Sequence, residues 1–453
     1  MLDGRFSNAP HVPRASAFLD SGQMIRDPVS VFEKYRAQLG PTFSFHFGGA
    51  RRAIVSTDPD VIAHVLKKNR ENYQKSDIQV KYMVEFQGEG LVNIHGDAWK
   101  RQRKLVAQGF RADRLSELLP VQIALLDELM AGFDAEAAAG PVDVHAQMVR
   151  LTLGLVGKSI FGRAMTDAEL QQIADTISAI QGFIVRQIVQ PYLIPWFRIS
   201  GQSERYQQLR RDADQIVLRH IQQRRDAGTG ELDFLRILLE TPYMDTGEPM
   251  GEAQAMVEAL QLMVAGNETS SNGLTWVLYL LGQHPEHLPR IRQEVDTILG
   301  EGPITFEALH RLDWTMKVIY EALRLYPPFW MIDRIALEDD NINGIHVPKG
   351  ALVIPYIYGT HRNPALWAEP ERFEPSRFDR EKRRSRPTFG YIPFGGGPRL
   401  CVGNNMAIMQ MLLIVALLVR RYDIAAAGGA VGIRPMMLLR PDGAVQMRFD
   451  ARG

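Results

Sequence analysis

Cysteine is almost absent from this sequence, which has 453 residues and a single thiol, Cys401. One cysteine cannot form an internal disulfide, and it cannot supply the four thiolates that an iron–sulfur cluster requires. No Cys or His residue has the spacing needed to complete a closed tetrahedral zinc site around it. We therefore expect a protein without disulfides, and the cytoplasm is the expected compartment.

Net charge is also absent. The 52 lysines and arginines are balanced by 52 aspartates and glutamates, and no block of like charges or low-complexity tract interrupts the chain. A protein that binds nucleic acid usually has a basic stripe or patch, so nothing electrostatic indicates such a partner. With 45% apolar residues, the composition is typical of a globular protein.

Long hydrophobic runs are missing as well. The N-terminal stretch "MLDGRFSNAPHVPRAS" has neither the charged start nor the apolar centre of a signal peptide. The most apolar run, "MLLIVALLV" from Met411, is much shorter than the roughly 20 residues of a membrane span. We expect no secretion signal or membrane anchor, and we expect this run to form a buried core helix.

The organisation of the chain indicates one mainly helical domain over residues 1–453. At roughly 150 residues per domain, the length alone would suggest about three domains. No internal repeat and no Gly/Ser-rich or Pro-rich linker divides it. We expect three parts: a β-containing N-terminal part at about 27–75, a helical core at about 95–326, and a Cys-loop and C-terminal part at 327–453.

Local patterns place the elements within these parts. "DPVSVFEKYRAQLG" predicts a helix ending at Gly40, and the next two apolar stretches predict a hairpin with Gly48 and Gly49 in its turn. From about residue 59 to 326, apolar residues recur at helical spacing. After Pro327, "INGIHVPKGALVIPYIY" predicts short strands joined by tight turns.

The lone cysteine lies in a nest of glycines, "FGGGPRLCVG", residues 394–403. Glycines allow the backbone to approach a ligand closely, and the apolar helix that follows places Cys401 near a positive dipole end that favours thiolate. A buried structural cysteine is the plain alternative. A nucleophile would need a base such as His361 or His346, which are expected in strand and turn contexts, and sequence leaves spatial adjacency open. A single thiolate ligand on a haem iron is the third interpretation.

Five residues of this nest resemble the haem-binding signature Phe-x-x-Gly-x-Arg-x-Cys-x-Gly of the cytochrome P450 family: Phe394, Gly397, Arg399, Cys401 and Gly403. The chain is similar to a soluble, bacterial-type member. The resemblance implies a mainly α fold with a smaller β-rich region (α+β), a triangular helical prism with haem b between a long distal helix and the helix after the Cys loop. It also implies that Cys401 binds the iron, with Phe394, Arg399 and Gly403 around the cofactor.

The segment "EALR" places Glu321 and Arg324 three residues apart on a helix. A surface ion pair of this kind is common and is worth about 0–1 kcal/mol. Apolar residues cover most of this helix, however, so the two charges are expected to be buried and to need further partners. The family resemblance supplies Arg377, in "FEPSRF", as the third member of a structural triad on the haem side.

The segment "AGNETS" lies inside a periodic stretch from about 251 to 283. A turn between two helices or a solvated polar patch is one interpretation. In the other, the Thr269 hydroxyl binds the carbonyl of Ala265 and opens the helix ladder, while Gly266 leaves room for a small ligand or water. The resemblance implies that Ala265 lies by the cofactor and that Glu268, where many members have Asp, relays protons together with Thr269.

A basic segment, "HGDAWKRQRKLVAQGF", covers residues 95–110. Such runs are usually solvated helix faces. Trp99 and Arg103 are four residues apart, however, and pair an indole N–H with a guanidinium, both suited to a carboxylate. The resemblance implies that these two residues, together with Arg334 and Arg399, bind the haem propionates.

Substrate contacts are expected in apolar segments that match the recognition regions of the family, although such residues are more often plain core. The candidates are Ile78, Met83, Phe86, Leu91, Phe183, Leu262, Phe329, Trp330, Met331, Ile332, Met436 and Met437. These residues suggest a hydrophobic substrate such as a fatty acid, terpenoid, steroid or aromatic compound. The implied reaction is a monooxygenation with O₂, typically a hydroxylation.

Electrons are expected from NAD(P)H through a separate ferredoxin or flavodoxin and its reductase, because residues 402–453 are too few for a flavin or iron–sulfur domain. Arg383, Arg384 and Arg386 are a candidate docking charge, or simply a solvated loop. We expect a monomer. A peroxide-using relative, a non-enzymatic haem carrier or sensor and a haem-free cysteine hydrolase stay open, although the first two would not need the pair Glu268 and Thr269.

Overall fold

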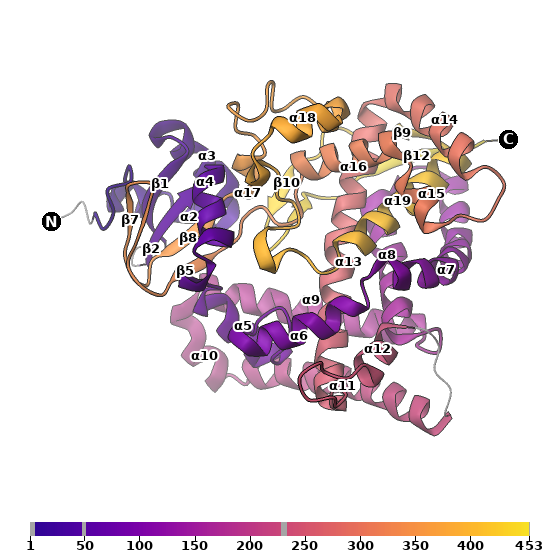
Figure 1. Ribbon diagram of the computed structural model, residues 1–453, viewed down its shortest axis with the longest axis horizontal. Coiled ribbons are helices and arrows are strands. Elements are labelled where there is room, and N and C mark those ends of the chain that lie inside the picture. Colours follow the sequence, from indigo (N-terminus) through magenta and orange to yellow (C-terminus); the bar gives the residue numbers. More distant parts are fainter. Residues whose placement is uncertain (1–4, 48–50, 228–232, 453) are drawn as a thin grey trace. The chain divides into compact units, whose positions relative to one another are not determined.

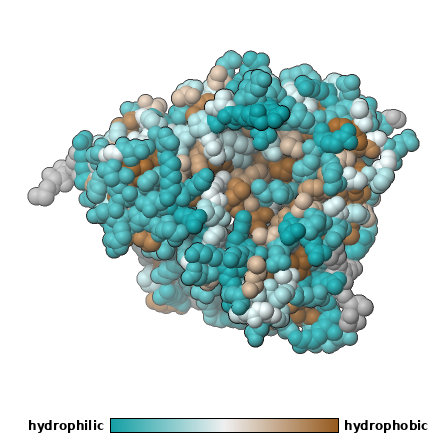
Figure 2. Space-filling view, viewed as in Figure 1, coloured by the Kyte–Doolittle hydropathy of each residue, from teal (hydrophilic) through white to brown (hydrophobic). Residues whose placement is uncertain are grey.

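The computed structural model describes residues 5–47, 51–227 and 233–452. The chain divides into two units that interleave along the sequence. Unit 1 contains Met1–Asp77, Lys317–Cys401 and Val431–Gly443, and unit 2 contains Ile78–Met316, Val402–Ala430 and Ala444–Gly453. Hydrophilic residues predominate on the face shown in Figure 2, in agreement with the balanced charge of the sequence.

Unit 1 mixes strands with short helices. Its strands are β1 (Thr42–Phe47), β2 (Arg51–Ser56), β3 (Tyr73–Gln74), β5 (Arg334–Ala336), β6 (Asp340–Ile342), β7 (Ile345–Val347), β8 (Leu352–Pro355), β10 (Ile433–Pro435) and β11 (Leu439–Pro441). Its helices are α1 (Arg14–Leu19), α2 (Ser21–Arg26), α3 (Pro28–Leu39), α4 (Pro59–Ala63), α17 (Ile357–Thr360), α18 (Arg380–Ser385) and, from Lys317 onward, α16 (Asp313–Leu325). Shorter helical turns are η1 (His64–Lys68), η2 (Arg70–Asn72), η5 (Pro375–Phe378), η6 (Thr388–Gly390) and η7 (Gly397–Arg399).

The main sheet of unit 1 has the strand order β1-β2-β8-β5-β3, and β1, β2, β8 and β5 are labelled in Figure 1. β2 pairs antiparallel with β1 and parallel with β8. Side chains alternate between two clusters: Ile54 and Val353 pack in one, and Val55 and Ile354 pack in the other. Because successive side chains of a strand point to opposite faces, both faces of this sheet are covered.

The N-terminal predictions are confirmed where the structure describes them. α3 begins after Asp27, whose side chain accepts a hydrogen bond from the Ser30 N–H at 3.1 Å, and it ends at Gly40, which has a φ of 95°. The hairpin is β1 and β2, while Gly48 and Gly49 of its predicted turn lie outside the described residues.

Strands also follow residue 327 as predicted, except at one end. β6 and β7 form a hairpin, and β8 joins the main sheet. The strand expected to run through Tyr358 ends at Pro355, and α17 follows. There the N–H and the hydroxyl of Thr360 both bind the carbonyl of Tyr356, each at 2.9 Å, which closes a helical turn where a strand was expected.

Unit 2 is mainly helical. Its helices are α5 (Asp77–Gln87, which begins at the last residue of unit 1), α6 (Gly96–Gln108), α7 (Ala112–Ala139), α8 (Val144–Phe161), α9 (Asp167–Val189), α10 (Ile194–Ile199), α11 (Gln202–Ala227), α12 (Phe234–Glu240), α13 (Glu252–Gln283), α14 (Leu288–Leu299), α15 (Phe306–His310) and α19 (Asn404–Arg421). Single turns are η3 (Pro191–Leu193) and η4 (Pro285–His287). β4 (Val142–Asp143), β12 (Gln446–Ala451) and β9 (Tyr422–Ala426) form its sheet in that order.

α13 is the long helix predicted for about 251–283. It is continuous over 32 residues, or about 48 Å at 1.5 Å per residue. It packs along α8, and the Thr152 hydroxyl of α8 donates a hydrogen bond to Oδ1 of Asn267 at 2.7 Å. The polar residues in its middle therefore belong to one unbroken helix, and the alternative of a turn between two helices is excluded.

α19 contains the apolar run that starts at Met411. In the part of the chain that the structure describes, it is the one helix long and apolar enough to cross a bilayer, but 67% of that stretch is buried inside the protein. Twelve of its residues are buried, including Leu412, Leu413 and Val415. The prediction of a buried core helix is confirmed.

Candidate active site

The cysteine nest is a tight loop that ends with the thiol accessible to solvent. The Cys401 N–H donates to the carbonyl of Phe394 at 3.0 Å, and the Leu400 N–H donates to the carbonyl of Gly397 at 3.1 Å. Cys401 is exposed, three residues before α19 begins. Among the described residues, no group of three or more His, Cys, Asp or Glu side chains could hold a metal ion. The loop therefore presents its sulfur to solvent.

Gly397 shows why this loop requires glycine. Its φ is 66°, and a Cβ atom there would lie 2.0 Å from the carbonyl oxygen of Leu66 in η1. A side chain would force the backbones of η1 and η7 apart. The loop that carries Cys401 is thus held in direct contact with a neighbouring helical turn.

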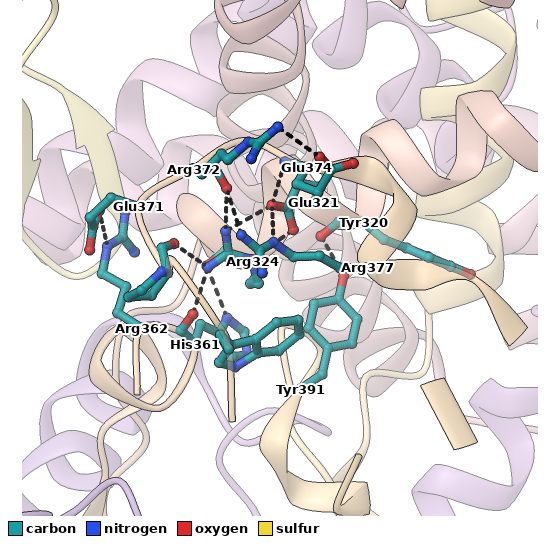
Figure 3. Close-up of polar contacts among 12 residues, drawn as sticks. Tyr320, Glu321, Arg324, His361, Arg362, Glu371, Arg372, Glu374, Arg377 and Tyr391 are labelled. Carbon is teal, nitrogen blue, oxygen red and sulfur yellow. Dashed lines mark hydrogen bonds and ion pairs between the residues drawn. The ribbon is translucent and has the colours of Figure 1, made fainter. Parts of the chain in front are cut away.

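A cluster of buried charges joins α16 to the segment that precedes this loop (Figure 3). Arg324 pairs with Glu321 through Nε–Oε2 and Nη2–Oε1 distances of 2.7 and 2.8 Å, and the Nε of Arg377 lies 3.2 Å from Oε1 of the same carboxylate. Glu321 and Arg324 are completely buried, and Arg377 is 9% exposed. The sequence predicted this triad, and the structure contains its ion pairs.

The remaining donors of the triad bind backbone carbonyls. Arg324 Nη1 donates to the carbonyls of His361 and Pro370 at 2.8 and 2.7 Å, and Arg377 Nη2 donates to the carbonyl of Glu369 at 2.8 Å. Buried charges are costly unless they are paired and hydrogen-bonded, and here both conditions are met. The triad therefore fastens the irregular segment 361–377 to α16.

His361 continues this network to the cysteine loop. Its Nε2 lies 2.9 Å from the N–H of Ile392, and its Nδ1 lies 3.2 Å from the carbonyl oxygen of Arg324. Burial, and then the charge of Arg324, holds the pKa of His361 well below its ordinary value of 6.5. The ring is therefore neutral, with Nδ1 as donor and Nε2 as acceptor.

His361 lies in a turn, which is one of the two contexts expected for it. It is a completely buried residue at the C-terminal cap of α17, and its Nε2 is engaged with the loop backbone. His346 lies on β7 and is exposed, as the sequence suggested for a strand residue. His361 thus acts on the loop that carries Cys401, and its ring nitrogens are already occupied.

A cationic cluster in unit 1 includes a residue that sequence reasoning missed. Burial, and then the charges of Arg334 and Arg399, lowers the pKa of Lys75 to about 7, and the opposing effect of Asp333 is smaller. Arg334 is 8% exposed, and burial lowers its pKa too. Clustered cations that repel one another are an environment that favours a bound anion. The signal for Lys75 was present in "NYQKSD" but was not distinctive.

Trp99 and Arg103 lie in unit 2, on one face of α6. Both side chains are partly exposed. The helix keeps them four residues apart, so that the indole N–H and the guanidinium follow the same face. Their arrangement agrees with the predicted spacing.

The Thr269 hydroxyl donates a hydrogen bond to the carbonyl of Ala265 at 2.6 Å, as predicted. Glu268 is partly buried, and its backbone carbonyl accepts hydrogen bonds from the side chains of Ser271 and Asn272 at 3.1 and 2.8 Å. Extra side-chain hydrogen bonds of this kind compete with the regular backbone hydrogen bonds of a helix. α13 is nonetheless helical throughout, so these bonds do not interrupt it.

The role expected for Gly266 is corrected. A Cβ atom on Gly266 would lie 3.0 Å from Cγ1 of Val156 in α8. The space that its missing side chain leaves is filled by a neighbouring helix, so it is not room for a small ligand. Glycine here permits the close packing of α13 on α8.

The substrate candidates of unit 1 lie in different surroundings. Trp330 is 3% exposed and packs in an aromatic cluster with Phe32 and Tyr356, and its Nε1 donates to the carbonyl of Met436 at 2.8 Å. This placement indicates core packing. Phe329 and Met436 are 42% and 38% exposed, and Met331, Ile332 and Met437 are partly buried.

The candidates of unit 2 cluster around α5 and α9. Phe86 and Phe183 are both 1% exposed, and their rings meet edge to face at 5.4 Å. Met83 and Leu91 are buried, and Leu262 is partly buried. Ile78 belongs to α5, but its side chain lies outside the described part.

A pocket in unit 2 is lined by four helices: α5, α9, α11 and α13. Its walls include Phe86, Gln87, Thr176, Arg210, Gln261 and Val264. Sequence reasoning placed Phe86 among the substrate contacts but did not point to Thr176 or Arg210. Thr176 and Arg210 lie on helical turns without any motif, so no local signal could have identified them.

A buried carboxylate fastens the loop after α5 to α13. Both oxygens of Glu258, which is completely buried, accept from the N–H of Leu91 at 2.9 and 3.2 Å, and Oε1 also accepts from Nε2 of Gln102 at 2.7 Å. Burial raises the pKa of Glu258. One turn later, Gln261 binds the N–H of Val92 and the carbonyl of Gly88, each at 3.2 Å. The loop at residues 88–93 is thus fixed to the helix that forms one wall of the pocket.

The arginines considered for partner docking separate into two kinds. Arg386 turns inward, with its guanidinium 3.6 Å from the centre of the Trp367 ring and its Nη2 donating to the carbonyl of Arg377 at 2.9 Å. Arg383 and Arg384 lie on α18 and are exposed. Arg386 is therefore part of the packing around the triad, and the accessible charge of this segment comes from α18.

Comparison with known proteins agrees with this geometry. The sequence model of the family "Cytochrome P450" matches residues 10–446, which span both units. A cyclooctat-9-en-7-ol 5-monooxygenase of Streptomyces melanosporofaciens is 27% identical over 84% of this chain and 82% of its own. A taurochenodeoxycholic 6 alpha-hydroxylase of Sus scrofa is 29% identical over 83% and 77%, and the LUTEIN DEFICIENT 5 protein of Arabidopsis thaliana is 26% identical over 95% and 75%. The chain belongs to the cytochrome P450 family and is an oxidoreductase of the monooxygenase type.

Proposed function

We propose that this chain is a haem-thiolate monooxygenase that inserts one oxygen atom from O₂ into a hydrophobic small molecule, with haem b bound through Cys401. The observation that carries the proposal is the accessible sulfur of the only cysteine at the end of a loop fixed by η1 and by the His361 network. A thiolate donates electron density to iron and favours cleavage of the O–O bond, and bound haem supplies that chemistry.

The donor set of the chain fits an anionic cofactor. Lys75, Arg334 and Arg399 bring three positive charges together, and the carboxylates of a haem would relieve their mutual repulsion. Trp99 and Arg103 of α6 add an indole N–H and a guanidinium as further hydrogen-bond donors. Phe394 and Gly403 lie at the two ends of the loop that carries the thiol.

Protons are the second contribution of the chain. The Thr269 oxygen donates its own hydrogen to the carbonyl of Ala265, which leaves its lone pairs free to accept one from a bound molecule. The carboxyl of Glu268, next to Thr269, is the titratable group that replaces a proton passed on by the Thr269 hydroxyl. The role proposed for this pair is to hold and deliver protons, while the substrate pocket limits water.

We further propose that electrons from NAD(P)H arrive through a separate ferredoxin or flavodoxin with its reductase, and that the exposed arginines of α18 contribute to docking. The proposal includes a single functional domain over residues 1–453 that works as a monomer in the cytoplasm. It involves no nucleic acid.

The spectrum of the reduced protein with carbon monoxide tests the thiolate. We expect the red-shifted Soret band of a haem-thiolate in the wild type and its loss in Cys401→Ser. A haem spectrum that is identical in Cys401→Ser would overturn the assignment. A protein that takes up no haem would overturn the proposed function as a whole.

Thr269→Ala tests the proton relay. We expect electron consumption to continue while product formation per electron falls by about 10-fold or more, since positioned proton transfer contributes roughly 10²–10⁴-fold in rate. Ser270→Ala, at the neighbouring buried position, serves as the control. Undiminished coupling in Thr269→Ala, or efficient turnover with hydrogen peroxide in place of O₂ and electrons, would contradict the proposed route.

A further inference from the structure

A short arm, residues 5–13, covers the outer edge of the main sheet of unit 1, where β1 is the first strand in the sheet order. The Val12 N–H donates to the carbonyl of Ser44 in β1 at 2.9 Å, and the Ser44 N–H donates to the carbonyl of Pro10 at 2.8 Å. Two further hydrogen bonds, each 2.6 Å long, join the arm to the β6–β7 hairpin. Because an unpaired sheet edge can pair with another chain, the arm protects β1.

The β1 side chains beneath this arm are polar, although they are buried. Ser44 and His46 share one face of β1, because the side chains of a strand alternate between its two faces. The Ser44 hydroxyl lies 3.0 Å from Nδ1 of His11 in the arm. His46 is 2% exposed, and its ring lies edge to face against the rings of Phe6 and His11, with centroids 5.2 and 5.5 Å away. Two histidines thus lie together where the arm contacts the sheet.

A hydrogen bond from Arg14 defines the protonation state of His46. Arg14 begins α1, directly after the arm, and its Nη2 donates to Nε2 of His46 at 3.1 Å. A guanidinium can only donate, so Nε2 accepts and the single proton of the ring is on Nδ1. Nδ1 is buried, and within the described part of the chain it has no hydrogen-bond partner. The contact between Arg14 and His46 therefore requires the neutral ring.

A second proton on the His46 ring opposes this contact in two ways. It occupies Nε2, so that two donors face each other, and it places a positive charge next to the guanidinium of Arg14. Two more groups act on the charge of His46: His11 of the arm, and Arg52 of β2, which pairs with His46 in the sheet register. Burial first, and then the charges of Arg14, His11 and Arg52, lowers the pKa of His46 below its ordinary value of 6.5.

We propose that this contact is a pH-sensitive switch: protonation of His46 breaks its hydrogen bond with Arg14 and releases the arm from β1. Release exposes the N–H and the carbonyl of Ser44 at the edge of the sheet, where another strand can pair. Histidine suits this role because its charge changes at mildly acidic pH. The switch goes beyond the proposed monooxygenase, since the arm, α1 and β1 take no part in that chemistry.

The direction of the pH effect follows from proton binding. When the arm is released, His46 is accessible to water and has an ordinary pKa near 6.5, so the released form binds a proton that the docked form excludes. Docking is therefore complete above pH 6.5 and weakens as the pH falls below it. For one proton, the docking equilibrium changes by at most about 10-fold per pH unit, until the docked form is protonated too.

Hydrogen exchange of the full chain, followed by mass spectrometry, measures docking of the arm. After correction for the intrinsic pH dependence of exchange, peptides from residues 5–13 and 42–47 should lose about 3- to 10-fold of their protection between pH 6.5 and 5.5. Peptides from β9 and β12 in unit 2, whose paired residues include no histidine, should keep theirs. Constant protection of the arm, or an equal loss of protection in β9 and β12, would overturn the proposal.

His46→Gln separates the proton from the contact. A glutamine oxygen can accept the hydrogen bond from Arg14 but does not titrate, so the arm should be protected at pH 7.5 and should lose less protection at pH 5.5 than in the wild type. His346→Gln is the matched control, because this exposed histidine of β7 contacts the arm only through its backbone in the bonds described above. A wild-type acid response in His46→Gln, or an equally reduced response in His346→Gln, contradicts the assignment.

Arg14→Gln tests the same contact from its other side, and it decides the case if His46→Gln weakens the docked arm at neutral pH. A glutamine amide can donate to the neutral ring of His46, or turn its oxygen toward the protonated ring, and it has no charge. The arm of Arg14→Gln should therefore stay docked to a lower pH than that of the wild type. Release at the same or a higher pH would show that Arg14 and His46 do not form the switch.

Discussion

The ring nitrogen Nε2 of His361 lies 2.9 Å from the backbone nitrogen of Ile392. On its other side, Nδ1 of the same ring faces the carbonyl of Arg324 at 3.2 Å. One neutral imidazole thus joins the buried charge triad to the segment that leads into the cysteine loop (Figure 3). The position of the sulfur depends on residues that do not touch it.

Replacing His361 by Phe should destabilise the fold by about 2–4 kcal/mol, because a buried N–H and a buried carbonyl each lose a partner. The free energy of unfolding from urea titration measures this loss. His346→Phe, at an exposed position of β7, should change stability by less than about 0.5 kcal/mol. A variant of His361 as stable as the wild type would contradict the linking role.

The same histidine should contribute to acid sensitivity. The pKa of His361 lies well below 6.5 in the folded chain, so below pH 6.5 the unfolded chain binds a proton that the folded chain does not. Stability therefore falls as the pH decreases through that range, by at most about 1.4 kcal/mol per pH unit for this group. In His361→Phe the slope between pH 6.5 and 5 should be smaller than in the wild type, and an equal slope would rule out this contribution.

Glu321→Gln should cost about 3–5 kcal/mol, because two buried arginines lose the carboxylate that balances them. Glu240→Gln removes one partner of an exposed pair with Arg236 and should cost no more than about 1 kcal/mol. Urea unfolding measures both changes. If the two variants are equally stable, then the triad does not support the fold in the way its geometry indicates.

Gly397→Ala should disrupt the cysteine loop, since the new Cβ would lie 2.0 Å from the Leu66 carbonyl oxygen and the φ of 66° disfavours alanine. We expect a loss of haem content together with lower thermal stability. Gly22→Ala in α2, where nothing lies within 4 Å, should instead be neutral or stabilising by up to about 1 kcal/mol. Full haem content in Gly397→Ala would show that the loop tolerates displacement from η1.

Lys75→Met should have opposite effects on the two forms of the protein. Without a bound anion, removing one of three clustered cations relieves repulsion with Arg334 and Arg399, so the haem-free chain becomes more stable. Haem affinity should fall by about 10- to 100-fold, the equivalent of one charge-assisted hydrogen bond. Haem transfer to an acceptor protein and unfolding of the haem-free chain measure the two sides. If haem affinity and the stability of the haem-free chain both fell, Lys75 would have a merely structural role.

Much of the fold and of the candidate site was predictable because the relevant residues are close in sequence. The α3 caps at Asp27 and Gly40, the pairing of Glu321 with Arg324 and the bond from Thr269 to Ala265 all depend on neighbours within one or a few helical turns. In each case a few adjacent side chains satisfy their own hydrogen bonds, so the pattern of residue types is sufficient to locate them.

Other features could not be predicted because they depend on contacts distant in sequence. Gly266 was expected to leave room for a ligand, but Val156 occupies that space. Arg386 was considered a docking charge, but it stacks on Trp367. Thr176 and Arg210 line a pocket because helices α9 and α11 pack beside α13, and nothing in their local sequence marks them.

The amino-acid sequence by itself determined the local patterns that mark the candidate residues, because the cysteine loop, the pairing of Glu321 with Arg324 and the acid and alcohol pair are each encoded by residues at short, fixed spacing. The tertiary structure alone decided which of the remaining side chains are buried, which gather charge of one sign and which fill the space beside a glycine. Burial and neighbouring charge are properties of packed surfaces, and those surfaces exist only after segments far apart in the chain have come together.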